Sequence, residues 1–219
     1  MFIGHFGAGL AAAKLKGAPS APVLIIGSQL TDVGFFALAL FGIERFRLDE
    51  GVTELNPFDL YHMPYTHSLV GTAGWALAFG LLVLLFTRRL SATAIAAAVV
   101  ASHWLLDWLT HQPDLSLAGG PPYFGLGLWN VPALEIPLEL FVFLGGAWLY
   151  ARAVPTISPA GRWSLLAVTA LLVAVQLLNW FGAPTTTAPG LIALQALAAF
   201  IVTALAFWIV DRLRKRRPS

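Results

Sequence analysis

Three polar residues recur at four-residue intervals near the end of an apolar stretch, residues 90–111: His103, Asp107 and His111. Residues at i, i+4 and i+8 of an α-helix lie along one face, so the three side chains form one polar stripe. Ionisable side chains inside a membrane segment are costly, and such a stripe is interpreted first as a functional site. Because two imidazoles and a carboxylate are ligands that zinc accepts, the stripe predicts a metal centre.

Other ionisable side chains in or beside apolar stretches add to this supply of ligands. They are His5, Asp32, His67 and Glu139. Carboxylates brought together at low dielectric need a cation, so a shared site favours a divalent metal. The set is large enough for one Zn²⁺ ion or for two ions about 4 Å apart. A hydrolytic zinc keeps one position for water and lowers the pKa of that water to about 7, and a remaining carboxylate can act as general base.

Each of these residues also has a purely structural interpretation. A lone histidine in a membrane helix can bond a backbone carbonyl of a neighbouring helix, and Ser68 can be a packing serine. His62 and His111 are near predicted helix ends, where solvated or capping roles are common. Glu135 is expected to be a solvated carboxylate favoured by the helix dipole. The gathering of so many polar groups in a chain this poor in charge still favours one shared site.

The elements that must position these residues are membrane helices. The chain has 219 residues, of which 58% are hydrophobic and only 11% charged, whereas soluble domains carry about 25% charged residues. Mean hydropathy is +0.77. There is no cysteine, which excludes disulfides and thiolate ligands. Six stretches are close to the roughly 20 residues that cross a bilayer: residues 22–43, 66–86, 90–110, 132–153, 162–181 and 189–210.

We therefore predict an all-α, polytopic membrane bundle that forms a single domain over residues 1–219. Residues 2–13 are too short to span, so they form a half-helix or an interfacial helix. Residues 1–140 would carry the metal site, residues 141–211 would be scaffold helices, and residues 212–219 a basic tail. The tail is typical of a cytoplasmic membrane flank and is not evidence for nucleic-acid binding.

Basic residues fall on one side of the predicted spans, and the positive-inside rule makes that side cytoplasmic. They are Lys14, Lys16, Arg88, Arg89, Arg152, Arg162 and the tail cluster. The long loops 44–65 and 111–131 then lie on the other side, and the site opens toward that side. The second loop is rich in glycine and proline, and we expect it to cover the site.

Four segments resemble a known family. They are Ile3-Gly4-His5, Asp32 within its apolar span, Tyr65-Thr66-His67-Ser68-Leu69, and Ser102-His103-Trp104-Leu105-Leu106-Asp107. The chain is similar here to bacterial membrane-bound, metal-dependent hydrolases, also described as LexA-binding, inner-membrane-associated hydrolases. Residues 110–115, 125–130 and Glu139 resemble a subgroup. The resemblance covers about the first 140 residues. His62 departs from the family pattern, because Met63-Pro64-Tyr65 follows it where members often carry an Arg-Gly pair.

The resemblance implies an inner-membrane location and a metal site formed by His5, Asp32, His67, His103 and Asp107. We assign catalytic roles to Asp107, Glu139 and His111. The expected activity is hydrolysis of a lipid or lipid-linked ester, amide or phosphoester in the membrane.

Two other functions fit the same residues. His and Asp on facing helices also suit an ion or proton transporter, although no internal repeat is evident. A closed site with four protein ligands would instead be a structural metal in a non-enzymatic membrane protein.

Overall fold

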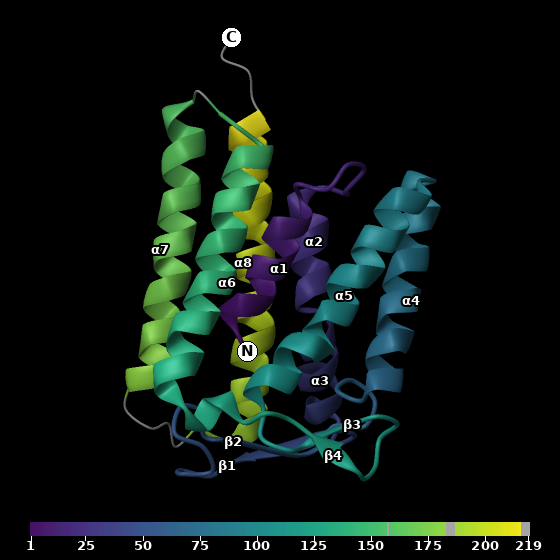
Figure 1. Ribbon diagram of the computed structural model, residues 1–219, viewed down its shortest axis with the longest axis vertical. Helices are drawn as coiled ribbons and strands as arrows, with labels where there is room; N and C mark the ends of the chain where they lie inside the picture. Colours follow the sequence, from purple (N-terminus) through teal and green to yellow (C-terminus); the bar gives the residue numbers. More distant parts are fainter. Residues whose placement is uncertain (157, 183–186, 216–219) are drawn as a thin grey trace.

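The structure is a computed structural model that describes residues 1–156, 158–182 and 187–215. Within these ranges the chain forms α-helices, a single 3₁₀ turn and two short antiparallel strand pairs (Figure 1). The helices are α1 Ile3–Ala12, α2 Ala21–Ser28, α3 Leu30–Leu40, α4 Leu69–Thr87, α5 Leu90–Thr110, α6 Pro132–Ala153, α7 Pro159–Phe181 and α8 Pro189–Lys215. The strands are β1 Arg45–Leu48, β2 Phe58–His62, β3 Leu115–Ser116 and β4 Tyr123–Phe124, and the 3₁₀ turn is η1 Leu128–Asn130.

The long helices have the length and composition of membrane spans. In the described part of the chain, α4 to α8 each qualify alone, and α2 with α3 forms a sixth candidate span bent by 49°. The all-α bundle of a multi-pass membrane protein is thus confirmed. Predicted and observed ends differ by a few residues. For example, α4 begins at Leu69 rather than at residue 66, because Ser68 caps it by accepting a hydrogen bond from the Gly71 N–H at 3.0 Å.

Helix α1 lies in the middle of the bundle, against α6 and close to α2 and α5 (Figure 1). Of the two placements left open for this segment, the structure has the half-helix inside the protein, not the interfacial helix. Close approach to α6 requires two glycines, because a Cβ on Gly146 would lie 2.1 Å from the Gly7 carbonyl oxygen. This contact carries His5 into the interior of the protein.

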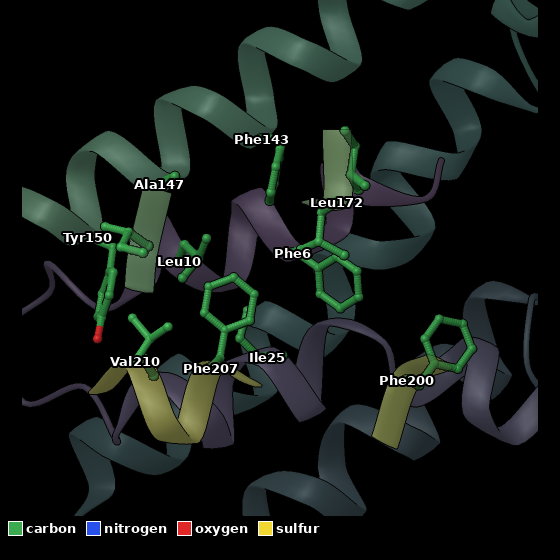
Figure 2. Close-up of a cluster of buried hydrophobic side chains, with 13 residues drawn as sticks. Phe6, Leu10, Ile25, Phe143, Ala147, Tyr150, Leu172, Phe200, Phe207 and Val210 are labelled. Carbon is green, nitrogen blue, oxygen red and sulfur yellow. The ribbon is translucent and has the colours of Figure 1, made fainter. Parts of the chain in front are cut away.

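A cluster of buried apolar side chains joins α1 to the surrounding helices (Figure 2). Phe6 and Leu10 of α1 pack among side chains of α2, α6, α7 and α8, including Phe143 and Phe207. In a membrane the outer helix faces are already in an apolar medium, so close packing of this kind is what holds the helices together. The cluster thereby fixes the position of α1 along the length of the bundle.

The two ends of the bundle differ. Both strand pairs lie at one end, where β1 and β2 lie antiparallel with Leu48 opposite Phe58 (Figure 1). The opposite end carries the basic connections after α1 and between α4 and α5, the end of α6 with Arg152, the start of α7 with Arg162, and the end of α8 (Figure 1). Of the expected basic tail, residues 216–219 lie outside the described residues, as do residues 183–186 of the connection between α7 and α8.

Candidate metal centre

The five predicted ligands converge at the end of the bundle that carries the strands. His5 comes from the first turn of α1, Asp32 from α3 and His67 from the residue before the α4 cap, while His103 and Asp107 share one face of α5. Four of the five are buried, and the Asp32 side chain is 18% exposed. Residues from α1, α3, α5 and the segment before α4 thus meet in one polar site.

The imidazole nitrogens face the two carboxylates. His5 Nε2 lies 3.0 Å from Asp107 Oδ1, and His103 Nε2 lies 3.0 Å from Asp107 Oδ2. Asp32 Oδ1 is 3.3 Å from His67 Nε2 and 3.4 Å from His103 Nε2. Two sets each bring three ligand atoms within 4.8 Å of one another: His5, His103 and Asp107, and Asp32, His67 and His103. Groups this close and this well buried can hold a metal ion.

A second layer of contacts orients two of the imidazoles. His67 Nδ1 lies 2.8 Å from Thr66 Oγ1, and this hydroxyl donates to Glu44 Oε2 at 2.6 Å. Since the Thr66 proton is used on Glu44, the Thr66 oxygen accepts from His67 Nδ1–H, which leaves the Nε2 lone pair directed at the carboxylates. Such a carboxylate-supported imidazole is characteristic of metal-binding histidines.

The bend between α2 and α3 supplies the equivalent contact for His103. The Ser28 carbonyl at this break lies 2.9 Å from His103 Nδ1, which can donate to it. A carbonyl freed from a regular helix needs another donor, so the bend and the histidine satisfy each other. His103 Nε2 is then the nitrogen available to a metal.

Several buried polar atoms at the centre lack a hydrogen bond within the described residues. They are His103 Nε2 and Asp107 Oδ2, which face each other, and His5 Nδ1, the nitrogen of that ring that does not face Asp107. Burying a polar atom without a partner is unfavourable, whereas nitrogen and carboxylate lone pairs that point at one space suit a divalent cation. Asp107 Oδ1 accepts from the Met1 ammonium at 2.9 Å, so one of its two oxygens is already paired. The residues present therefore fit a metal.

His111 ends α5 and lies beside the centre. Its Nε2 is 3.5 Å from Asp107 Oδ1, and its Nδ1 is 2.9 Å from Asp114 Oδ1. The Trp129 ring covers it at a centroid distance of 4.1 Å, in agreement with a covering loop over residues 111–131. Burial lowers the pKa of His111, but Asp114 and Asp107 outweigh burial and raise this pKa to about 9. His111 can therefore carry a proton at neutral pH.

Glu139 is close to the centre but is held by other groups. One carboxylate oxygen accepts from the backbone N–H of Phe2 and, at 3.0 Å, of Gly4, while the other accepts from Gln176 Nε2 at 3.1 Å. These contacts anchor the start of α1, which presents His5. The carboxylate still lines the central cavity.

Outside the ligand set, the structure contradicts the expectation for Glu135 and agrees with that for His62. Glu135 was expected to be solvated, but its side chain is fully buried and neither oxygen has a hydrogen bond within the described residues. The error arises because Glu135 lies on the same face of α6 as the buried Glu139, four residues later, and this face is turned inward while Ala133 and Leu134 stay exposed. His62 lies exposed on β2, in agreement with the solvated role expected for it, although it is on a strand and not near a helix end.

A cavity of about 640 Å³ opens from the centre. Asp32, His67, Asp107, His111 and Glu139 line its polar end. Its walls include residues of α7 and α8, which we had assigned to scaffold alone. A concave site of this size is typical of small-molecule binding.

Sequence reasoning did not assign functional roles to the supporting residues. Glu44 is fully buried and, besides the Thr66 hydroxyl, also accepts from the Tyr65 and Thr66 N–H groups. The one available signal was its position as an acidic residue at the end of an apolar span. Gln176 gave a similar signal as an amide inside α7.

Comparison of the chain with protein-family models, curated proteins and solved structures found no match. The fold and the centre together define a multi-pass helical membrane protein with buried histidine and aspartate groups that can hold a metal ion.

Proposed function

We propose that the protein is a metal-dependent hydrolase of the membrane, related to the bacterial membrane-bound hydrolases that its motifs resemble. Its substrate would be a lipid or lipid-linked ester, amide or phosphoester. One observation carries the proposal: His103 Nε2 and Asp107 Oδ2 face each other without a hydrogen bond, and Asp107 lines a cavity of about 640 Å³. A purely structural polar cluster would be expected to satisfy these atoms internally.

We assign the five predicted ligands to metal binding. His5, Asp32, His67, His103 and Asp107 would hold the ion, most suitably Zn²⁺ given ligands of nitrogen and oxygen alone. Bound there, the ion would supply Lewis-acid activation of water and of the scissile group.

The remaining polar groups serve positioning and proton transfer. Asp32 lines the cavity with a side chain that is 18% exposed, and its carboxylate oxygen not used on the ion would take a proton from an attacking water. His111 Nε2 can donate a proton to the leaving group, and Asp114 holds the opposite edge of that ring at 2.9 Å. Glu139 positions α1 through the backbone of Phe2 and Gly4.

We further propose the bacterial inner membrane as the location, with the basic end of the bundle in the cytoplasm. The basic connections gather at the end opposite the strand pairs, which supports this orientation. The cavity lies beside the strand-bearing end, so the site would open away from the cytoplasm.

The test is hydrolysis by detergent-purified, Zn²⁺-loaded protein of a panel of acyl esters, acyl amides and phosphoesters. Asp107→Asn and His103→Ala should lower turnover by at least about 100-fold, because loss of metal activation removes several kcal/mol of transition-state stabilisation. His62→Ala, at an exposed histidine, is the matched control and should keep full turnover. Turnover that survives Asp107→Asn, or ion flux in liposomes that depends on Asp107, would contradict the proposal.

A further inference from the structure

The cavity beside the metal centre is amphipathic. Its polar end holds the His/Asp groups, whereas its apolar walls include Phe35, Phe36, Leu55, Ile192 and Phe200. These walls come from α3, from the loop between β1 and β2 and from α8. A ligand that fills this space has an apolar chain against the aromatic side and a polar head at the metal centre.

The charges that face the cavity are unbalanced. The carboxylates among its lining residues are Asp32, Glu50, Glu54, Asp107 and Glu139. Among the described residues that line it there is no lysine or arginine, and the one ammonium group, that of Met1, is paired with Asp107. A divalent ion, the Met1 ammonium and a protonated His111 would offset the carboxylates at the centre, which are Asp32, Asp107 and Glu139. Glu50 and Glu54 have no such cation among the described lining residues, so an anionic head would meet repulsion from these two carboxylates.

Neutral hydrogen-bonding groups occupy the same cavity. The amides of Asn56, Gln176, Asn179 and Gln195 all line it. Gln176 donates to Glu139 at 3.1 Å, and Asn179 Nδ2 lies 3.3 Å from the Gln176 amide oxygen. Amides of this kind pair with hydroxyl and amide groups of a ligand, and they lack the cationic fork or ammonium that usually binds phosphate.

From this distribution we infer that the cavity selects an amphiphile with one apolar chain and an uncharged, hydrogen-bonding head, and rejects the same chain with an anionic phosphate head. This inference rests on the proposed function and narrows its substrates to esters or amides of uncharged lipids. Glu50 and Glu54 contribute to the rejection from the exposed loop between β1 and β2. Specificity of this type comes from disfavouring the wrong ligand.

The experiment is competitive binding measured by native mass spectrometry on detergent-purified, Zn²⁺-loaded protein. An equimolar mixture of an alkylglycerol and the corresponding alkylglycerol phosphate is used, since their ether-linked chains are identical and contain no ester. We expect the uncharged ligand to be bound in about tenfold excess. Equal binding, or preference for the phosphate, would overturn the inference.

Substitutions in the loop between β1 and β2 test which residues cause the preference for the uncharged ligand. The double substitution Glu50→Gln with Glu54→Gln should reduce the preference several-fold, whereas Asp49→Asn should not, because Asp49 is an exposed acid of the same loop that does not line the cavity. All three changes are on exposed side chains, so folding is expected to be retained. A preference unchanged in the double variant would assign the selection elsewhere and overturn the role of this loop.

Two substitutions on α8 test whether the ligand binds inside the cavity. Ala196→Trp should reduce binding of the alkylglycerol because Ala196 lines the cavity, while Ala198→Trp, on an exposed position outside it, should not. Equal binding to both variants would place the ligand on the outer surface of the bundle and overturn the inference. Head-group selection without any hydrolysis would instead contradict only the proposed function.

Discussion

His103 Nε2 and Asp107 Oδ2 lie 3.0 Å apart on successive turns of α5, and neither atom has a hydrogen bond within the described part of the chain. The opposite nitrogen of His103 is held by the Ser28 carbonyl, so its ring is fixed by one edge and open at the other. Such pairs are favourable when a cation joins them, and the first prediction concerns that cation.

Purified protein is expected to contain one or two equivalents of a divalent metal by mass spectrometry, and His103→Ala and Asp107→Ala should lose most of it. Removing a ligand should weaken affinity by more than the roughly 10–100-fold seen for supporting residues. His62→Ala is the control and should retain the metal, because His62 is exposed and outside the centre. Equal metal content in the Asp107→Ala protein would contradict the assignment.

Metal removal should also lower thermal stability. A ligand bound only by the folded state stabilises it by about 2.7 kcal/mol at a free concentration of 100 Kd. Chelation should therefore lower the melting temperature of the wild-type protein in detergent and leave that of Asp107→Ala unchanged. A chelator-induced shift of the same size in both proteins would show that the effect has another origin.

Thr66→Val should weaken metal affinity by about 10–100-fold without unfolding the protein. The substitution removes the hydroxyl that lies between His67 Nδ1 and Glu44, so the ring loses its fixed orientation. Competition with a chelator of known affinity measures the change. Thr87→Val at the far end of α4 is the control, since that hydroxyl donates to the Val83 carbonyl and accepts from the Arg89 N–H, both distant from the metal centre. Identical affinities for the two variants would rule out the supporting role.

Gly146→Ala should destabilise the protein by about 1–3 kcal/mol and reduce metal content, because the new Cβ would lie 2.1 Å from the Gly7 carbonyl oxygen and push α1 away from α6. The neighbouring Gly145→Ala has open space around its Cβ and should be neutral or slightly stabilising. Melting temperature and metal content are measured on both. Similar behaviour of the two variants would contradict the placement of α1.

Arg214→Ala should destabilise the basic end of the bundle by about 2–4 kcal/mol, because it leaves three carbonyls without their charged donor. The guanidinium donates to Ala151 O at 3.0 Å, Val154 O at 2.6 Å and Gly161 O at 3.2 Å, joining α6, α7 and α8. Arg212→Ala is the control on the same helix, since Arg212 is exposed and only covers the Trp208 ring at 4.9 Å. A smaller loss of melting temperature in Arg214→Ala than in Arg212→Ala would refute this role.

The sequence predicted the membrane fold because apolar runs of bilayer length have few other solutions, and the six predicted spans coincide with the observed ones to within a few residues. It also grouped His103 with Asp107, since both lie on one helix face at a spacing that helix geometry dictates. These are properties of single helices.

Relations between segments were decided by packing. Nothing in residues 2–13 says whether a short apolar helix lies on the membrane or inside the bundle, and the Gly7–Gly146 contact settles it. The burial of Glu135 on the inward face of α6 and the use of Glu44 to orient His67 through Thr66 likewise depend on contacts between distant segments. The chain by itself determined which residue types enter the membrane, because their transfer cost is local. Tertiary structure alone decided which of them meet, because that depends on close contacts between segments far apart in the sequence.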